Sequence, residues 1–261
     1  MNTKLSTIPF SQFQSTLVLG TNIDACNWRT AIHAIHRWGN ARESRYVCLC
    51  NAHSLITARH SLPFRLALQG SDLSTPDGMP VTWMMRQLGF PNQQRINGPD
   101  LMWHYCSAAE HFQDSIFLYG SSEQTLKKLE EKLHAAFPKL LIAGNYSPPF
   151  RQLSTDEDAA IIDMINLSGA KVVFVSLGCP KQEIWMAKNR GKIWSVMLGV
   201  GAAFDYHAGT IQRAPNWMQQ RGLEWLYRLC AEPRRLWKRY VVTNSLFILH
   251  AFWQLTFGKR S

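Results

Sequence analysis

Short runs of strand-forming residues alternate with helical patterns along most of this chain, and the alternation limits the fold more than any other feature. The runs that favour strands are Ser15–Leu19, Tyr46–Cys50, Ser71–Leu73, Ser115–Tyr119, Leu140–Ala143, Lys171–Leu177 and Ser195–Val200. The segments that favour helices are Asp24–Trp38, His53–Leu68, Val81–Leu88, Asp100–Glu110, Glu123–Phe137, Asp156–Leu167 and Lys181–Asn189. The run Val172–Val175 is apolar throughout, as in a strand covered on both faces. The pattern predicts an α/β fold around a largely parallel sheet.

The sequence changes character after about Ala208. Strand patterns stop, and tryptophans begin to interleave with arginines. We therefore predict a boundary near residues 208–215. It would divide the chain into an α/β domain at 1–210 and a basic, Trp/Arg-rich helical appendage at 211–261.

This C-terminal segment carries most of the net charge of +10. From Arg213 to Ser261 the charge is +7, against +3 for the first 212 residues. Such an asymmetry indicates an anionic partner, which could be a diphosphate, an anionic membrane or nucleic acid. A solvated face on a terminal helix is the alternative.

The cysteines and the apolar segments indicate a cytoplasmic protein that does not span a membrane. None of the six cysteines forms a C-x-x-C pair, and no Cys/His cluster has zinc spacing, so we expect reduced thiols. Met1–Phe13 is polar and lacks the apolar run of a signal peptide. No segment reaches about 18 uninterrupted apolar residues. Tryptophans beside arginines in the appendage suit a membrane interface.

Polar or glycine-rich turns follow several predicted strands. They are Asn51–His53, Pro76–Gly78, Gly120–Ser122, Gly178–Glu183 and Gly199–Asp205. Ligands of parallel α/β sheets bind beyond the carboxyl ends of the strands. We therefore expect these turns to converge on one pocket.

The turn at Gly178–Gln182 has the composition of an anion site. Glycine allows close approach of the backbone, and Pro180 suits the first turn of a helix, whose free N–H groups favour an anion. Lys181 adds a charge, and the Gln182 amide could hold a ribose, a base or a phosphate. A simple strand–helix turn with exposed polar residues is the alternative.

Asp77 is the candidate general base. A carboxylate at a strand end can remove a proton from an attacking sugar hydroxyl, although capping of the next helix would also place an aspartate there. Asp156-Glu157-Asp158 resembles the D-x-D pattern of metal-dependent transferases, but its place after Ser154 favours ordinary capping of a helix. We therefore expect no metal.

Two classes of protein stay open on the glycine motif and on the basic appendage. Gly199-x-Gly201 is an incomplete dinucleotide fingerprint, which leaves a nucleotide-dependent oxidoreductase as an alternative. The basic appendage leaves a nucleic-acid-binding protein. Neither a G-x-S-x-G elbow nor a Walker loop occurs.

Arginines of the appendage are candidates for holding phosphate. Arg228, Arg235 and Arg239 fall on one face at helical spacing, and arginine forks match phosphate oxygens. A purely structural amphipathic helix would show the same spacing.

Several motifs in order resemble the WecG/TagA/CpsF family of glycosyltransferases from about Tyr46 to Tyr240. They are Thr75–Val81, Arg95–Leu101, Ser176–Glu183, Gly199–Asp205 with Gly209, Arg213–Pro215, Gly222–Leu229 and Glu232–Arg235. The resemblance implies an inverting transferase with a Rossmann-like body. It also implies a UDP-sugar donor, a polyprenyl-diphosphate-linked sugar acceptor, and no cofactor or divalent metal.

The resemblance also assigns roles to residues. Asp77 matches the catalytic base, and the appendage, through which the family associates with the membrane, closes its arginines over the donor diphosphate. The residues expected to bind substrate are Asn51, His53, Gly78, Asn97, Asp100, Gly178, Lys181, Gln182, Gly201, Asp205, Arg228, Arg235 and Arg239. We expect peripheral attachment to the inner face of the cell membrane and no nucleic-acid partner. A homo-oligomer is possible.

Overall fold

The computed structural model describes residues 13–258. The prediction for the polar N-terminal segment therefore lies almost wholly outside the described residues.

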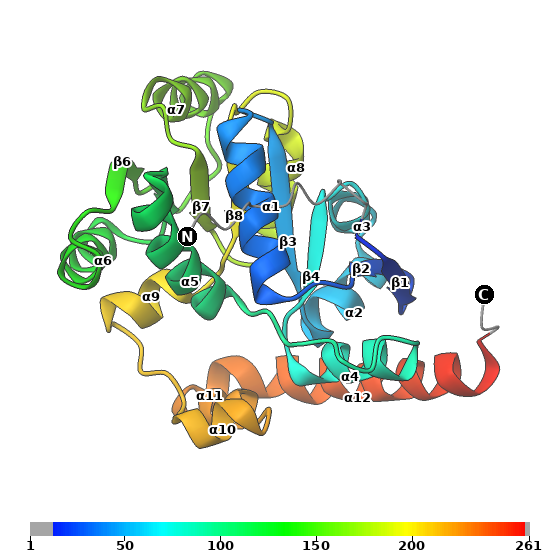
Figure 1. The fold of residues 1–261 in the computed structure, drawn as a ribbon. Coiled ribbons are helices and arrows are strands. Elements are labelled where there is room, and N and C mark those ends of the chain that lie inside the picture. Colours follow the sequence, from blue (N-terminus) through cyan, green and yellow to red (C-terminus); the bar gives the residue numbers. More distant parts are fainter. Residues whose placement is uncertain (1–12, 259–261) are drawn as a thin grey trace, which may run out of the picture.

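A six-stranded parallel sheet forms the centre of the molecule (Figure 1). Its strands are β3 (Arg45–Cys50), β4 (Leu73–Pro76), β5 (Ser115–Gly120), β6 (Leu141–Tyr146), β7 (Val172–Ser176) and β8 (Val196–Gly199). They lie in the order β4-β3-β8-β7-β5-β6, and each neighbouring pair is parallel. The predicted α/β fold with a Rossmann-like parallel sheet is confirmed.

Helices cover both faces of this sheet. Their bounds are α1 (Trp28–Asn40), α2 (Ala52–His60), α3 (Leu62–Gln69), α4 (Met79–Gln87), α5 (Gly98–Phe112), α6 (Glu123–Ala136), α7 (Thr155–Leu167), α8 (Lys181–Asn189) and α9 (Ala203–Ala208). Val172 and Phe174 pack in one apolar cluster with α1, α5, α6 and α9. Val173 and Val175 pack in the other, with α2, α3, α4, α7 and α8. The apolar run in β7 is thus buried on both sides, as its composition predicts.

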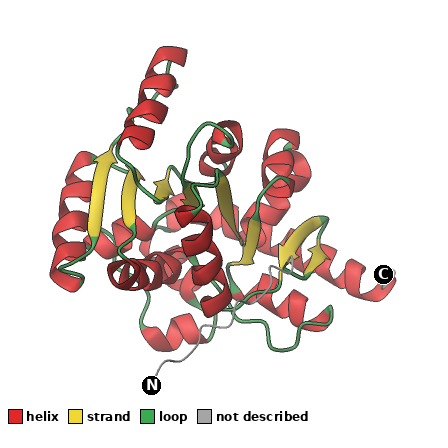
Figure 2. Ribbon diagram, turned by 45° about the horizontal axis from the view of Figure 1, so that its top comes forward, coloured by secondary structure: helices red, strands yellow, loops and turns green. Residues whose placement is uncertain are grey.

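Two local features differ from the sequence-based expectations, one strand that was not predicted and one helix that is divided. Thr21–Asp24 is a strand, β2, which pairs with β1 (Ser15–Val18) in a separate antiparallel hairpin (Figure 2). Leu19 and Gly20 both have positive φ angles, 51° and 86°, as a two-residue hairpin turn requires. The helix expected at His53–Leu68 is divided into α2 and α3 because Pro63, in the first turn of α3, cannot continue a preceding helix.

Between residue 210 and the last described residue, 258, three helices lie together at one end of the sheet (Figure 1). They are α10 (Asn216–Gln220), α11 (Glu224–Ala231) and α12 (Pro233–Phe257). Phe247 and Ala251 of α12 join the apolar cluster that contains α2. Gln254 accepts a hydrogen bond from the Leu19 N–H at 2.9 Å, so α12 also contacts the hairpin. The division of the chain into two domains stays a prediction.

Arg228 does not share a helix with Arg235 and Arg239, contrary to the spacing argument. Pro233 is the first residue of α12, so the helical pattern restarts there. Large apolar side chains on α12 are about half exposed or more: Trp237, Val241, Val242, Ile248, Leu249, Phe252, Trp253 and Phe257. Within residues 13–258, none of the helices has the length and apolar character needed to cross a membrane.

Close packing fixes α5 against the end of β8. A Cβ atom added at Gly98 would lie 2.5 Å from the carbonyl oxygen of Val200. We expect Gly98→Ala to lower the free energy of unfolding by about 1–3 kcal/mol, because the two backbones must separate. Urea denaturation would measure the loss. Ser107→Ala, on the exposed side of the same helix, is the control and should change stability little. An unchanged midpoint for Gly98→Ala would contradict this packing.

Candidate functional site

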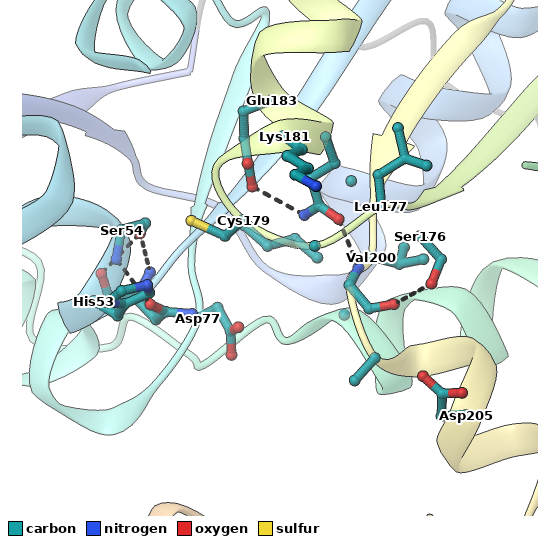
Figure 3. A pocket seen from close by; sticks show the side chains of 18 of the residues that line it. His53, Ser54, Asp77, Ser176, Leu177, Cys179, Lys181, Glu183, Val200 and Asp205 are labelled. Atoms are coloured by element: carbon teal, nitrogen blue, oxygen red, sulfur yellow. Dashed lines mark hydrogen bonds between the residues drawn. The ribbon is translucent and has the colours of Figure 1, made fainter. Parts of the chain in front are cut away.

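A cavity of about 1030 Å³ opens at the carboxyl ends of the strands. Residues that follow each of the six strands line it: Asn51, Asp77, Ser121, Pro148, Gly178 and Gly201. Residues of α11 and α12 line it as well, so the segment after residue 210 forms part of its wall. Figure 3 shows Asp77, Lys181 and Asp205 around this opening.

Nearly all of the residues predicted from the sequence meet in this cavity. Those that line it are Asn51, His53, Asp77, Gly78, Asn97, Gly178, Lys181, Gln182, Gly201, Asp205, Arg228, Arg235 and Arg239. Asp100 is the exception. Both of its carboxylate oxygens accept hydrogen bonds from Arg213, at 2.5 and 3.1 Å, and it does not line the cavity. A contact between Asp100 and substrate stays a prediction.

The Asn97 side chain caps α5 and binds Asp100. Its side-chain oxygen accepts a hydrogen bond from the Asp100 N–H at 3.0 Å and so caps α5. Its amide nitrogen donates to the Asp100 carboxylate at 2.6 Å. The side chain is buried, so it shapes the cavity wall while its polar atoms are already bonded.

The side-chain amide of Gln182 also forms its hydrogen bonds within the protein. It donates to Glu183 at 2.9 Å and accepts from the Gly201 N–H at 3.1 Å. These bonds tie the turn after β7 to the turn after β8. The amide therefore holds the shape of the pocket floor, whereas Lys181 is exposed at the rim.

Asn51 and His53 enter the cavity from the start of α2. The Asn51 side chain accepts a hydrogen bond from the Ser54 N–H at 3.0 Å, which caps the helix. Burial and the nearby Arg239 guanidinium lower the pKa of His53 to about 4. His53 is therefore neutral at pH 7 and can donate or accept hydrogen bonds without adding charge.

Asp77 stands at the end of β4. Its N–H donates to the Cys50 carbonyl at 2.8 Å, which fixes the turn against β3. The side chain is 21% exposed and lies 3.6 Å from Arg95. Burial raises the pKa of the Asp77 carboxyl; Arg95 opposes this shift and Glu224 adds to it. A carboxylate of raised basicity at an accessible position is suited to proton abstraction.

Most other carboxylates of the cavity are more buried than Asp77 or hold a shorter contact to a cation than the 3.6 Å between Asp77 and Arg95. Glu183 is 2% exposed. Asp158 accepts from Lys188 at 2.6 Å, and Glu224 accepts from Arg95 at 2.8 Å. Asp205, in the first turn of α9, is the remaining carboxylate and accepts a hydrogen bond from Thr210 at 3.3 Å.

The cavity also carries uncompensated positive charge. Among the described residues, Lys181, Arg228 and Arg239 line it without an ion-pair partner, whereas Arg235 pairs with Glu232. The Nε atoms of Arg228 and Arg239 are buried and donate no hydrogen bond to the described protein. Unpaired buried donors are costly. Both guanidinium groups line the cavity, which makes it suited to an anion with several oxygen atoms.

A chain of alternating charges, which no local pattern in the sequence indicates, links Asp77 to α11. Arg95 contacts both Asp77 and Glu224, and Glu224 also accepts a hydrogen bond from Arg213 at 3.3 Å. Arg95, Arg213 and Glu224 all belong to the recognised motifs. The signal that could have found them is a charged residue inside each motif, but the pairing of Arg95 with Glu224 spans more than a hundred residues.

The comparisons with known proteins agree with this geometry. The model of the glycosyl transferase WecG/TagA/CpsF family matches residues 16–261. This chain belongs to that family. A relative from Bacillus spizizenii is N-acetylglucosaminyldiphosphoundecaprenol N-acetyl-beta-D-mannosaminyltransferase. It is 31% identical over 195 residues, which cover 74% of each chain. The chain is therefore a WecG/TagA/CpsF glycosyltransferase.

The Asp156–Asp158 segment forms the first turn of α7. Ser154 caps α7 and exchanges hydrogen bonds with Glu157, and Asp158 binds Trp185 and Lys188. Over residues 13–258 there is no group of three or more His, Cys, Asp or Glu side chains that could hold a metal ion.

The buried carboxyl of Glu183 makes the stability of this transferase depend on pH. Burial raises its pKa from 4.5 to about 7, so its contribution is fully present below about pH 4.5 and is lost as the pH rises through 7. Relative to Glu183→Gln, the wild type should lose about 3 kcal/mol between pH 4 and pH 8.5. Urea denaturation of both proteins at these two pH values would measure it. Parallel pH profiles would contradict a buried, titrating Glu183.

Proposed function

We propose that this WecG/TagA/CpsF glycosyltransferase moves a sugar from a UDP-sugar to a polyprenyl-diphosphate-linked saccharide with inversion at the anomeric carbon. One observation carries the proposal. A single cavity holds both an accessible carboxylate of raised basicity, Asp77, and three cations, Lys181, Arg228 and Arg239, which have no ion-pair partner within residues 13–258. Transfer of a sugar from a nucleoside diphosphate needs a base for the attacking hydroxyl and positive charge for the departing diphosphate.

In the proposed reaction Asp77 removes the proton from the attacking hydroxyl of the acceptor. The hydroxyl oxygen forms a bond to the anomeric carbon while the bond from that carbon to the diphosphate oxygen breaks. UDP leaves with the bonding electrons. The name of the relative describes transfer of an N-acetyl-β-D-mannosaminyl group. UDP-sugars of this kind are α-linked, so one displacement with inversion accounts for a β product.

Negative charge grows on the diphosphate as the bond breaks. Arg228 and Arg239 line the cavity with buried, unbonded Nε atoms, and Lys181 lies at its rim. Charges that are fixed in place before the reaction stabilise the leaving group without reorganisation, and in many enzymes this effect accounts for most of the rate enhancement. Asn51, His53 and Asp205 are among the polar side chains of the cavity that are available to orient the sugars.

The acceptor in the proposal is a saccharide carried on a polyprenyl diphosphate, in biosynthesis of a cell-surface polysaccharide. The relative acts on such a lipid, according to its name. The exposed apolar side chains of α12 and the basic charge of the segment after residue 210 suit an anionic membrane surface. We place the protein at the inner face of the cell membrane, where UDP-sugars are available.

A screen of donors tests the proposed function. The full chain would be incubated with a short-chain polyprenyl-diphosphate N-acetylglucosamine and, one at a time, with UDP-N-acetylmannosamine, UDP-N-acetylglucosamine and UDP-glucose. Mass spectrometry should show the acceptor heavier by one sugar with one of these donors, and the N-acetylhexosamine donors are expected first. UDP release without a heavier acceptor would contradict transfer to this lipid.

Membership of this family argues against the two rival classes. An oxidoreductase would bind a nicotinamide dinucleotide, and a nucleic-acid-binding protein would bind duplex or single strands with steep salt dependence. We expect the protein to prefer UDP and anionic vesicles to either of these ligands.

A further inference from the structure

Arg95 lies between two carboxylates that come from different parts of the chain. Its Nη2 atom is 2.8 Å from Glu224 and 3.6 Å from Asp77. Asp77 belongs to the turn after β4, whereas Glu224 opens α11. The shorter contact is the one to α11. Arg95 is therefore drawn toward the C-terminal segment and away from the carboxylate at the strand end.

Glu224 is itself held from the other side. Its Oε1 atom accepts a hydrogen bond from Arg213 at 3.3 Å, and Arg213 is fixed by a two-point contact with Asp100. The Glu224 side chain is 12% exposed and the Arg95 side chain 19%. At such burial, opposite charges interact more strongly than they do at a fully exposed surface. The position of Glu224 depends on α11 lying against the body of the protein.

We propose that Glu224 is a positioning residue that holds Arg95 off Asp77, so that docking of α11 leaves the Asp77 carboxylate free to act as the base. The inference rests on the proposed role of Asp77 and adds a regulatory element to it. Without Glu224, the nearest carboxylate to Arg95 is Asp77. A full ion pair with Arg95 would stabilise the ionised carboxylate and weaken it as a proton acceptor.

Charged groups on both sides of the cavity shift the pKa of Asp77. Arg95, in the segment before α5, stabilises its ionised form, and Glu224 of α11 disfavours it. The Cys50 thiol of β3 lies nearby and is neutral, since burial raises its pKa far above the physiological range. Loss of Glu224 thus removes a repulsive charge and releases an attractive one, and both changes act in the same direction.

The test is a double-mutant cycle read out in pH profiles of the full chain. For Glu224→Gln we expect the acid limb of kcat/KM to move to lower pH by about one unit, with about a tenfold lower kcat at pH 7.5. In an Arg95→Gln background the same substitution should move the acid limb by clearly less, because only the repulsive charge is lost and there is no guanidinium to release. Glu131→Gln, on the exposed surface of α6, is the control and should match the wild type.

Arg213→Gln distinguishes the positioning of Arg95 by Glu224 from a role of Glu224 in merely anchoring α11. It weakens the attachment of Glu224 on the side away from Asp77 but leaves the Glu224–Arg95 contact. We expect a lower rate with no downward move of the acid limb. The inference is overturned if Glu224→Gln leaves the acid limb unchanged, or if it moves the limb equally in the Arg95→Gln background. Asp77→Asn, measured in the same series, distinguishes failure of this inference from failure of the proposed function. An active Asp77→Asn would reject the assignment of Asp77 as the base.

Discussion

Replacing Asp77 with asparagine is expected to lower kcat for sugar transfer by about 10²–10⁴-fold, the usual contribution of a general base. Asparagine has nearly the same shape but cannot accept the proton of the attacking hydroxyl. The substitution leaves the cations of the cavity in place, so the affinity for UDP should change little. Initial rates with the lipid acceptor and calorimetric titration with UDP would measure both quantities.

The pH dependence gives this prediction a second readout. Burial raises the pKa of Asp77 above 3.8. The wild-type rate should therefore fall as the pH drops through this raised value, because the base becomes protonated. In Asp77→Asn the residual rate should lack that acid limb. Asp205→Asn is the matched control, since its carboxylate lines the same cavity. If Asp205→Asn removed the acid limb and Asp77→Asn kept it, the base assignment would be reversed.

Loss of both unpaired arginines should nearly abolish donor binding. Arg228→Ala with Arg239→Ala removes two charges that face the cavity without carboxylate partners. A hydrogen bond to a charged group contributes about 1.5–3 kcal/mol, so we expect each substitution to weaken UDP binding by roughly 10–100-fold. Calorimetry of the single and double variants would measure the losses.

Two comparisons make that result specific to the diphosphate. Uridine, which lacks phosphate, should bind the wild type and the double variant with similar affinity. Arg234→Ala removes an exposed charge from α12, the helix of Arg239, and should not change UDP binding, since Arg234 does not line the cavity. Equal losses for uridine and UDP would show that the arginines support the fold and not the diphosphate.

The sequence predicts the sheet and the pocket well because both follow from local patterns. Apolar runs such as Val172–Val175 mark buried strands, and Asp77 and Gly178 follow predicted strand ends. Parallel strands bring such turns to one edge by geometry alone. The hairpin was missed because β2 is short and polar and continues into the helical pattern of α1.

Contacts between distant segments were not predictable in the same way. Arg95 and Glu224 each stand in a recognised motif, yet nothing local indicates that they meet. Asp100 looked like a ligand-binding residue, but Arg213, more than a hundred residues away, occupies its carboxylate. Gln182 shows the same limit, because its amide is already bonded to Glu183 and Gly201.

One chain supplies both halves of the site, with its own α11 and α12 beside its own strand ends. Co-expression of Asp77→Asn and Arg239→Ala chains under two affinity tags, with tandem purification of any mixed species and assay of the whole mixture, tests it most directly. We predict no more activity than the sum of the two single variants. Recovery toward a quarter of the wild-type rate would show that the arginines of one chain close the cavity of another, and would contradict the arrangement described above.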